Sequence, residues 1–149
     1  MTSKRSESAK SKDADVFRLV GAAYRKLDKR LAKAARASEL TLPQFRALDA
    51  LRRDPDLPMG ELGRRLGVTA GNMTFVVDRL VDKGLAERKH EKRDRRRYVV
   101  SLTKEGEAAA KTAAKKIDEE IAKALNVLAD KERDALADAL ENIANAPDD

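Results

Sequence analysis

The stretch Met59–Leu102, MGELGRRLGVTAGNMTFVVDRLVDKGLAERKHEKRDRRRYVVSL, decides the fold that this sequence predicts. It indicates two short helices joined by a tight turn, with the second helix leading directly into a basic hairpin. Gly67 is expected to end the first helix. Thr69 is expected to cap the second, because a threonine hydroxyl at the N-cap accepts hydrogen bonds from free backbone N–H groups. Gly84 then ends the second helix, so the stretch predicts a helix-turn-helix followed by a hairpin.

The second predicted helix has one apolar side and one free side. The apolar side is formed by residues spaced i, i+3, i+4 and i+7, namely Met73, Val76, Val77 and Leu80. The free side near the N-terminus carries small and hydrogen-bonding residues, which are Ala70, Gly71, Asn72 and Thr74. Small side chains allow a helix to approach base edges closely in the major groove of DNA. This helix is therefore predicted to read DNA.

The hairpin encloses a strongly charged loop. Residues 85–90 and 98–102 predict two strands, and Tyr98, Val100 and Leu102 are expected to alternate toward one face. Between Arg88 and Arg97 the sequence has seven basic and two acidic residues, so its loop, EKRDRRR, is too charged to be buried. Such a run is either a solvated surface or a DNA contact, and its place directly after a helix-turn-helix favours the DNA contact.

The pattern ELGRRLGVT-(x)4-T-(x)3-DRL-(x)2-KGL, followed by R-(x)5-DRR-(x)4-SLT-(x)2-G, resembles the MarR family of winged helix-turn-helix regulators. The resemblance extends from about Val16 to Ile143. It implies that the second helix lies in the major groove, that residues 69–74 form the base-reading turn, and that the wing places arginine at the minor groove. Asp94 and Arg96 match the family's D-x-R wing motif. Phe75 is a departure, because many members have a basic residue there.

The predicted DNA contacts fall into three groups. The reading helix supplies Thr69, Ala70, Gly71, Asn72, Thr74, Phe75 and Arg79. The wing supplies Arg93, Asp94, Arg95, Arg96 and Arg97. On the first helix, Arg64 and Arg65 either clamp DNA phosphates or only add solubility. Within these groups, Asp94 is expected to pair with a neighbouring arginine while Arg96 enters the groove, and Phe75 either contacts a thymine methyl group or turns inward.

The segments that flank the helix-turn-helix and its hairpin predict helices that need a partner to bury their apolar sides. Apolar residues keep heptad-like or three-and-four spacing over residues 13–36 and 103–128, and a last helix begins at Asp130. These stripes are too long to bury within one subunit, so residues 13–40 and 103–149 are expected to form a helical homodimerisation region. Residues 41–102 form the winged helix-turn-helix domain, in which residues 41–44 start a helix and Leu57-Pro58 could add a strand to the wing sheet. Residues 1–12 are expected to be a disordered basic tail.

Composition excludes several classes of protein. The chain has 149 residues, a net charge of +6 and a pI of about 9.6, which favour a polyanionic partner. It has no cysteine, which excludes disulfides, and His90 is its one histidine, which argues against a zinc site. No segment approaches the roughly 20 apolar residues of a membrane span, and the start lacks the apolar core of a signal peptide, so a cytoplasmic protein without a membrane partner is expected.

The predicted function is that of a sequence-specific double-stranded DNA-binding transcriptional regulator, with a repressor preferred. It would act as a homodimer on a pseudo-palindromic operator. No nucleophile, phosphate loop or metal-ligand cluster is recognisable, so neither an enzyme nor a cofactor is expected, and Asp78 and Arg79 are assigned to salt bridges or phosphate contacts. The alternatives are a sequence-indifferent architectural DNA-binding protein and a helical protein-interaction adaptor.

A small aromatic or phenolic effector is a further expectation, which comes from the family resemblance. Relatives place effector pockets between the dimer helices and the reader, which points to Phe17 and Tyr24 on the first helix. A core role is nevertheless preferred for both, since the sequence has only five aromatic residues of the Phe, Trp and Tyr types. His90 is expected to contact solvent or phosphate rather than to act as a pH switch.

Overall fold

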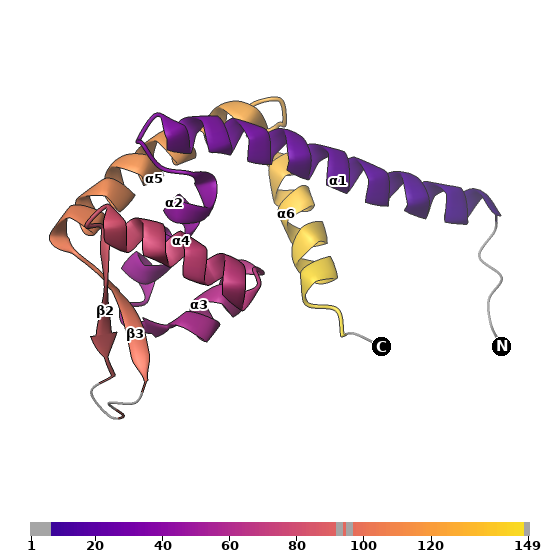
Figure 1. Cartoon of the computed structure of the whole chain (residues 1–149). Helices are drawn as coiled ribbons and strands as arrows, with labels where there is room; N and C mark the ends of the chain where they lie inside the picture. Colours follow the sequence, from indigo (N-terminus) through magenta and orange to yellow (C-terminus); the bar gives the residue numbers. More distant parts are fainter. Residues whose placement is uncertain (1–6, 92–93, 95–96, 148–149) are drawn as a thin grey trace.

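A computed structural model gives the fold of residues 7–91, 94 and 97–147 (Figure 1). This part of the chain contains six helices and a small antiparallel sheet, so the predicted fold class, mainly α with a β wing, is confirmed. In chain order the elements are α1 (Glu7–Arg36), α2 (Leu42–Arg53), β1 (Leu57–Pro58), α3 (Met59–Leu66), α4 (Ala70–Asp82), β2 (Ala86–His90), β3 (Tyr98–Leu102), α5 (Lys104–Leu125) and α6 (Asp130–Ala144).

Helix boundaries follow the local signals of the sequence. Three threonines cap helices with their side chains: the hydroxyl of Thr41 accepts from the Gln44 N–H, that of Thr69 from the Asn72 N–H, and that of Thr103 from the Gly106 N–H. α3 and α4 are both followed by a glycine with positive φ, 63° at Gly67 and 69° at Gly84, a conformation that glycine adopts without steric cost. The predicted starts and stops around the helix-turn-helix are therefore confirmed.

The core lies where α2, α3, α4 and α5 meet the sheet. Its largest fully buried side chains are Leu48, Leu51, Leu62, Met73, Val77, Leu80 and Val100. Three of the four residues predicted for the apolar side of α4 are among them, and Val76 is partly buried against the same cluster. Because this side of α4 is fixed to the core, the opposite side must face solvent.

The sheet has the strand order β1-β3-β2, with Leu57 opposite Val100. The short strand expected at Leu57-Pro58 is thus confirmed. The alternation expected in the last strand is wrong, because Val99, Val100 and Ser101 are all buried while Tyr98 is 55% exposed. β3 is the central strand of the sheet, and α2, α3 and α5 pack against it, which buries residues on both of its faces. Tyr98 is exposed because it lies at the hairpin end of the strand.

Much of α1 and all of α6 lie outside the core. Figure 1 shows the N-terminal part of α1 extending well beyond the other elements, and α6 lying below α1 in this view. α1 begins at Glu7 rather than at Asp13, so the expected disordered tail is wrong for residues 7–12, which contain no proline or glycine to interrupt a helix. Residues 1–6 lie outside the described residues.

The aromatic residues of α1 are not core residues of the single chain. Phe17 is 81% exposed and Tyr24 is 59% exposed, so the preferred core role is wrong at this level. The reason is that no other described part of the chain covers residues 12–20 of α1. α6 likewise has no buried residue, although it carries Leu136, Leu140 and Ile143. Among the described residues, no helix combines the length and apolar character needed to cross a membrane.

Candidate nucleic-acid interface

The free side of α4 presents every residue that the sequence assigned to the reading helix. All seven of these residues are exposed: Thr69, Ala70, Gly71, Asn72, Thr74, Phe75 and Arg79. A side chain built at Gly71 would meet no atom within 4 Å, so the space above this turn of the helix is open. The first residues of α4, Ala70, Gly71 and Asn72, are therefore both exposed and small, as close approach to base edges requires.

Hydrogen bonding within α4 limits what Thr74 can offer. Its hydroxyl donates to the backbone oxygen of Ala70 at 2.9 Å, one helical turn earlier. The hydroxyl can still accept a hydrogen bond, but its hydrogen is already used, and the γ-methyl group remains as an apolar contact. Asn72 keeps both the donor and the acceptor of its side-chain amide, since only its backbone N–H is used by the Thr69 cap.

Phe75 points outward. Its side chain is 61% exposed, so the alternative that it turns inward is wrong. The guanidinium carbon of Arg79, one turn later, lies 5.1 Å from the centre of the Phe75 ring, which is a cation–π contact. The same guanidinium lies 3.6 Å from the Asp82 carboxylate. Phe75 and Arg79 thus form a stacked pair on the exposed side of the helix.

Asp78 connects the reading helix to the wing. Its carboxylate pairs with the guanidinium of Arg88 on β2. The salt-bridge interpretation of Asp78 is confirmed, and the contact gives the hairpin a polar link to α4 in addition to its apolar packing.

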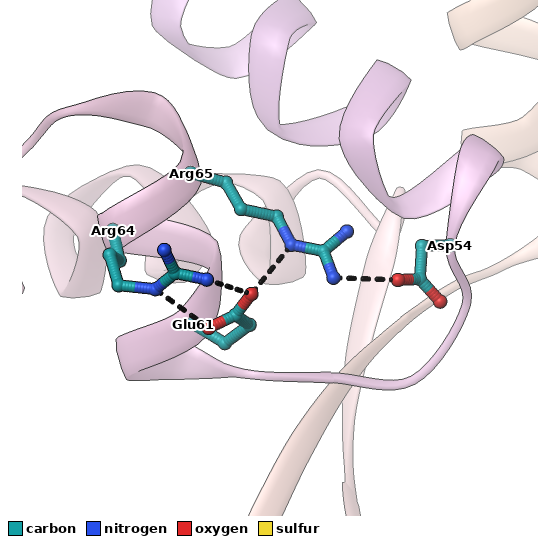
Figure 2. Close-up of polar contacts among 4 residues, drawn as sticks. All are labelled: Asp54, Glu61, Arg64 and Arg65. Carbon is teal, nitrogen blue, oxygen red and sulfur yellow. Dashed lines mark hydrogen bonds and ion pairs between the residues drawn. The ribbon is translucent and has the colours of Figure 1, made fainter. Parts of the chain in front are cut away.

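The two arginines of α3 are paired with carboxylates in the free chain (Figure 2). Arg64 donates to both oxygens of Glu61, at 3.0 and 2.7 Å. Arg65 donates to Glu61 at 2.7 Å and also lies 2.8 Å from Asp54, at the end of α2. The hydrogen bonds from Arg64 and then Arg65 lower the pKa of Glu61 to about 2. Glu61 is therefore ionised throughout the physiological range.

These pairs differ in how much of each arginine remains available. The Arg64 side chain is 74% exposed, whereas Arg65 bridges two carboxylates that belong to different elements. Arg65 therefore links α3 to the end of α2, whereas Arg64 keeps its Nη1 for a phosphate while Nε and Nη2 bind Glu61. The structure supports different roles for two residues that the sequence treated alike.

The described part of the wing forms a tight end. The Glu91 N–H donates to the Arg97 backbone oxygen at 2.8 Å, and the Arg97 N–H donates to the Asp94 backbone oxygen at 3.0 Å. The Arg97 side chain lies 3.8 Å from the Glu91 carboxylate. Arg93, Arg95 and Arg96 lie outside the described residues, so their predicted DNA contacts stay predictions. At the base of the loop, the rings of His90 and Tyr98 lie 4.4 Å apart, a cross-strand contact that the sequence analysis missed.

A cavity of about 400 Å³ lies between α2 and α4. Its apolar lining includes Pro43, Leu66 and Val76. Arg46 and Arg79 line it as well, and each is also paired with a carboxylate, Arg46 with Asp28 and Arg79 with Asp82. Neither Phe17 nor Tyr24 lines it. Sequence reasoning missed this cavity because its walls come from separate helices. In the described ranges, no three histidine or carboxylate side chains gather closely enough to hold a metal ion.

Comparison with known proteins gives consistent similarities. Residues 38–97 match the profile of the MarR family. The chain is 30% identical over 129 residues to an uncharacterized HTH-type transcriptional regulator, Mb0904 of Mycobacterium bovis, covering 87% of this chain and 90% of that protein.

Two solved structures extend the comparison to the fold. A mutant MarR from Escherichia coli complexed with operator DNA has a TM-score of 0.80 and 27% identity, covering 87% of this chain and 93% of that chain. The PcaV transcriptional regulator from Streptomyces coelicolor, in complex with its natural ligand, has a TM-score of 0.71 and 28% identity, covering 85% of this chain and 92% of that chain.

Proposed function

The chain belongs to the MarR family of transcriptional regulators, and from this membership we propose that it binds double-stranded operator DNA as a homodimer and regulates transcription, as a repressor. The observation that carries the proposal is the exposed side of α4, which is small at its N-terminus, is fixed from behind by Met73, Val77 and Leu80, and is joined to a basic wing. The similar MarR chain is seen with operator DNA. In this proposal α4 enters the major groove and the wing follows the adjacent minor groove.

Assembly as a dimer is supported by the apolar surfaces that the single chain leaves open. They lie on α1, at Val16, Phe17, Leu19, Val20 and Tyr24, and on α6, at Leu136, Leu140 and Ile143. Contiguous exposed apolar surface of this kind is typical of an interaction site. A two-fold dimer presents two reading helices, which matches the two-fold symmetry of a pseudo-palindromic operator.

A small-molecule effector is the second part of the proposal. It is supported by the ligand complex of the similar PcaV regulator. Phe17 and Tyr24 remain the residues proposed for a pocket at the dimer helices, where a partner subunit would cover them. The cavity between α2 and α4 is a second place, and its apolar walls with Arg46 and Arg79 suit a small aromatic acid. We also infer that the protein acts in the cytoplasm, where its operator lies, and without catalysis, which is supported by the naming of its relatives as transcriptional regulators.

The test is the selection of bound sequences from a random pool of double-stranded DNA. The expected result is a pseudo-palindromic site whose half-sites are one helical turn apart or a multiple of that distance. Replacement of Asn72 by alanine should then weaken binding to this site by about 1 to 3 kcal/mol and leave binding to random DNA nearly unchanged.

A matched control is replacement of Lys111 by alanine, which removes an exposed charge on α5, away from α4 and the wing. This variant should bind the selected site as the unaltered protein does. Recovery of random sequences would instead identify an architectural DNA-binding protein, and absence of DNA binding would favour a protein-interaction adaptor.

A further inference from the structure

The outermost ridge of α4 is apolar in the half that would enter the groove. A helix advances by 100° per residue, so Phe75 follows Gly71 by about one turn and Arg79 follows Phe75 by another, in a single row. This row is opposite the buried Met73, Val77 and Leu80. The first side chain that DNA meets on this ridge is therefore the exposed ring of Phe75.

The neighbours of Phe75 make room for the ring and hold it. Helical side chains point toward the N-terminus of their helix, and a side chain built at Gly71, one turn before Phe75, would meet no atom within 4 Å. From the other direction, Arg79 leans onto the ring with its guanidinium carbon 5.1 Å from the ring centre. The ring is thus held from its C-terminal side and open toward its N-terminal side.

The N-terminal half of this ridge has little hydrogen-bonding capacity, since the guanidinium of Arg79 lies in its C-terminal half. Gly71 has no side chain, Phe75 has no polar atom, and the hydroxyl hydrogen of the neighbouring Thr74 is donated to the Ala70 backbone oxygen. What Thr74 adds next to Phe75 is mainly its methyl group. In the major groove, the apolar feature that distinguishes one base from another is the 5-methyl group of thymine, which 5-methylcytosine shares.

We propose that Phe75, with the methyl group of Thr74, reads a 5-methylpyrimidine in each half-site of the operator, and that Arg79 is the positioning residue that holds the ring. The inference rests on the proposed function as an operator-binding dimer and adds the chemical class of base that α4 selects. A basic residue at position 75 would instead favour guanine or a phosphate. Phe75 therefore changes what this position recognises.

The experiment uses the full-length protein and the site selected from the random pool. Each thymine of the half-site is replaced in turn, symmetrically, by deoxyuridine, which removes the 5-methyl group and keeps every hydrogen-bonding group. At one position the replacement should lower the affinity of the protein about fourfold per half-site, the size expected when one methyl group leaves an apolar contact. With both half-sites changed, the loss should be about fifteenfold, since separate positions add.

The Phe75→Ala variant decides whether the ring reads the methyl group. It should bind the thymine and deoxyuridine duplexes equally, whereas Arg97→Ala, which changes the wing, should weaken both and keep their ratio. Arg79→Met should reduce the ratio of the affinity for the thymine duplex to that for the deoxyuridine duplex, because the ring loses its cation–π contact. An unchanged ratio would remove Arg79 from the proposal.

A second substitution of the DNA separates the methyl group from the shape of an A·T pair. At the sensitive position, 5-methylcytosine should bind about fourfold more tightly per half-site than cytosine in the unaltered protein, and equally in Phe75→Ala. The proposal is overturned if no deoxyuridine substitution weakens binding, or if Phe75→Ala keeps the discrimination. If the random pool yields no preferred site, the proposed function itself fails, and the two failures are distinguishable.

Discussion

Single residues of the helix-turn-helix have electrostatic partners that limit which of their groups are free to bind a ligand. Glu61 is the clearest case, because two arginines donate hydrogen bonds to one carboxylate and lower its pKa from 4.5 to about 2. Arg64 donates to this carboxylate from Nε and Nη2, which leaves the N–H groups of Nη1 for a phosphate. A carboxylate between two arginines nevertheless offsets part of their positive charge and so weakens the attraction of α3 for a phosphate.

The first prediction concerns the titration of Glu61. In the folded protein its carboxyl group should titrate near pH 2, because hydrogen bonds from Arg64 and Arg65 favour the ionised form. Its contribution to stability should be present above the unfolded pKa of 4.5 and lost as the pH falls toward about 2. The contribution should be small, since the ion pair of Glu61 with the exposed Arg64 is open to solvent and screened.

Carboxyl chemical shifts measured by NMR against pH provide the check. Arg64→Ala should raise the pKa of Glu61, and the control Arg53→Ala should not, since Arg53 pairs with Asp49 instead. A titration of Glu61 near 4.5 in the unaltered protein would contradict the prediction and would mean that the three side chains do not interact in solution.

At the scale of elements, the start of α5 is packed directly on the end of the helix-turn-helix. Thr103 donates from its hydroxyl to the Gly84 oxygen at 2.7 Å and from its backbone to the Leu85 oxygen at 3.2 Å. Gly106 then passes so close that a side chain there would lie 1.8 Å from the Leu85 oxygen. The backbone of α5 thus contacts the backbone at Leu85, just before β2 of the wing, and this contact requires glycine at position 106.

The second prediction follows from this close approach. Gly106→Ala should destabilise the protein by about 3 kcal/mol or more, because the backbone of α5 must move away from Leu85. Gly60→Ala on α3 is the matched control: a side chain there meets nothing within 4 Å, and alanine should stabilise the helix by about 0.5 to 1 kcal/mol. Urea unfolding measures both. Equal stability of the two variants would show that α5 is not packed this closely.

The wing gives the third prediction. Each phosphate contact that is removed should reduce the slope of log affinity against log salt concentration by about 0.9, so Arg95→Ala and Arg97→Ala should act mainly on this slope. Arg96→Ala should in addition abolish a preference for A·T pairs that flank the half-sites, because arginine is favoured in a narrow minor groove. Binding is measured against salt on operators with A·T and G·C flanks. Full flank preference in Arg96→Ala would reduce the wing to an electrostatic anchor.

At the scale of the whole molecule, the winged helix-turn-helix domain leaves two apolar surfaces uncovered, one on α1 and one on α6. Residues 41–102 contain most of the core, while residues 12–20 of α1 and all of α6 contribute no buried residue. The acidic α6 and the basic start of the chain also separate charge along the molecule. This arrangement is what a subunit of an intertwined dimer requires, because the exposed stripes become the core of the assembly.

The fourth prediction is that the protein is a dimer at micromolar concentration. Leu140→Asp should shift it toward monomer, since a charge would be buried in the interface, and should reduce affinity for the two-fold operator more than for a single half-site. Gly60→Asp, which adds the same charge on exposed α3, should leave the dimer intact. Sedimentation velocity measures the state. A monomer in the unaltered protein would rule out both the dimer and the two-fold operator.

The sequence alone determined the features that depend on neighbours in the chain. The helix start at Thr41, the cap at Thr69, the glycine stops, the apolar side of α4 and the existence of the hairpin follow from local hydrogen bonding and from helical or strand periodicity. The motif spacing also indicated the MarR family. Each of these features depends on residues that are only a few positions apart in the sequence.

Tertiary structure decided the features that join distant parts of the chain. The burial of Val99 as well as Val100, the outward direction of Phe75, and the cavity between α2 and α4 depend on which elements pack together. The pairing of Arg65 with Asp54 likewise joins two elements. Periodicity reports which side of an element is apolar but not which element covers it, since that choice is made by the packing of the whole core.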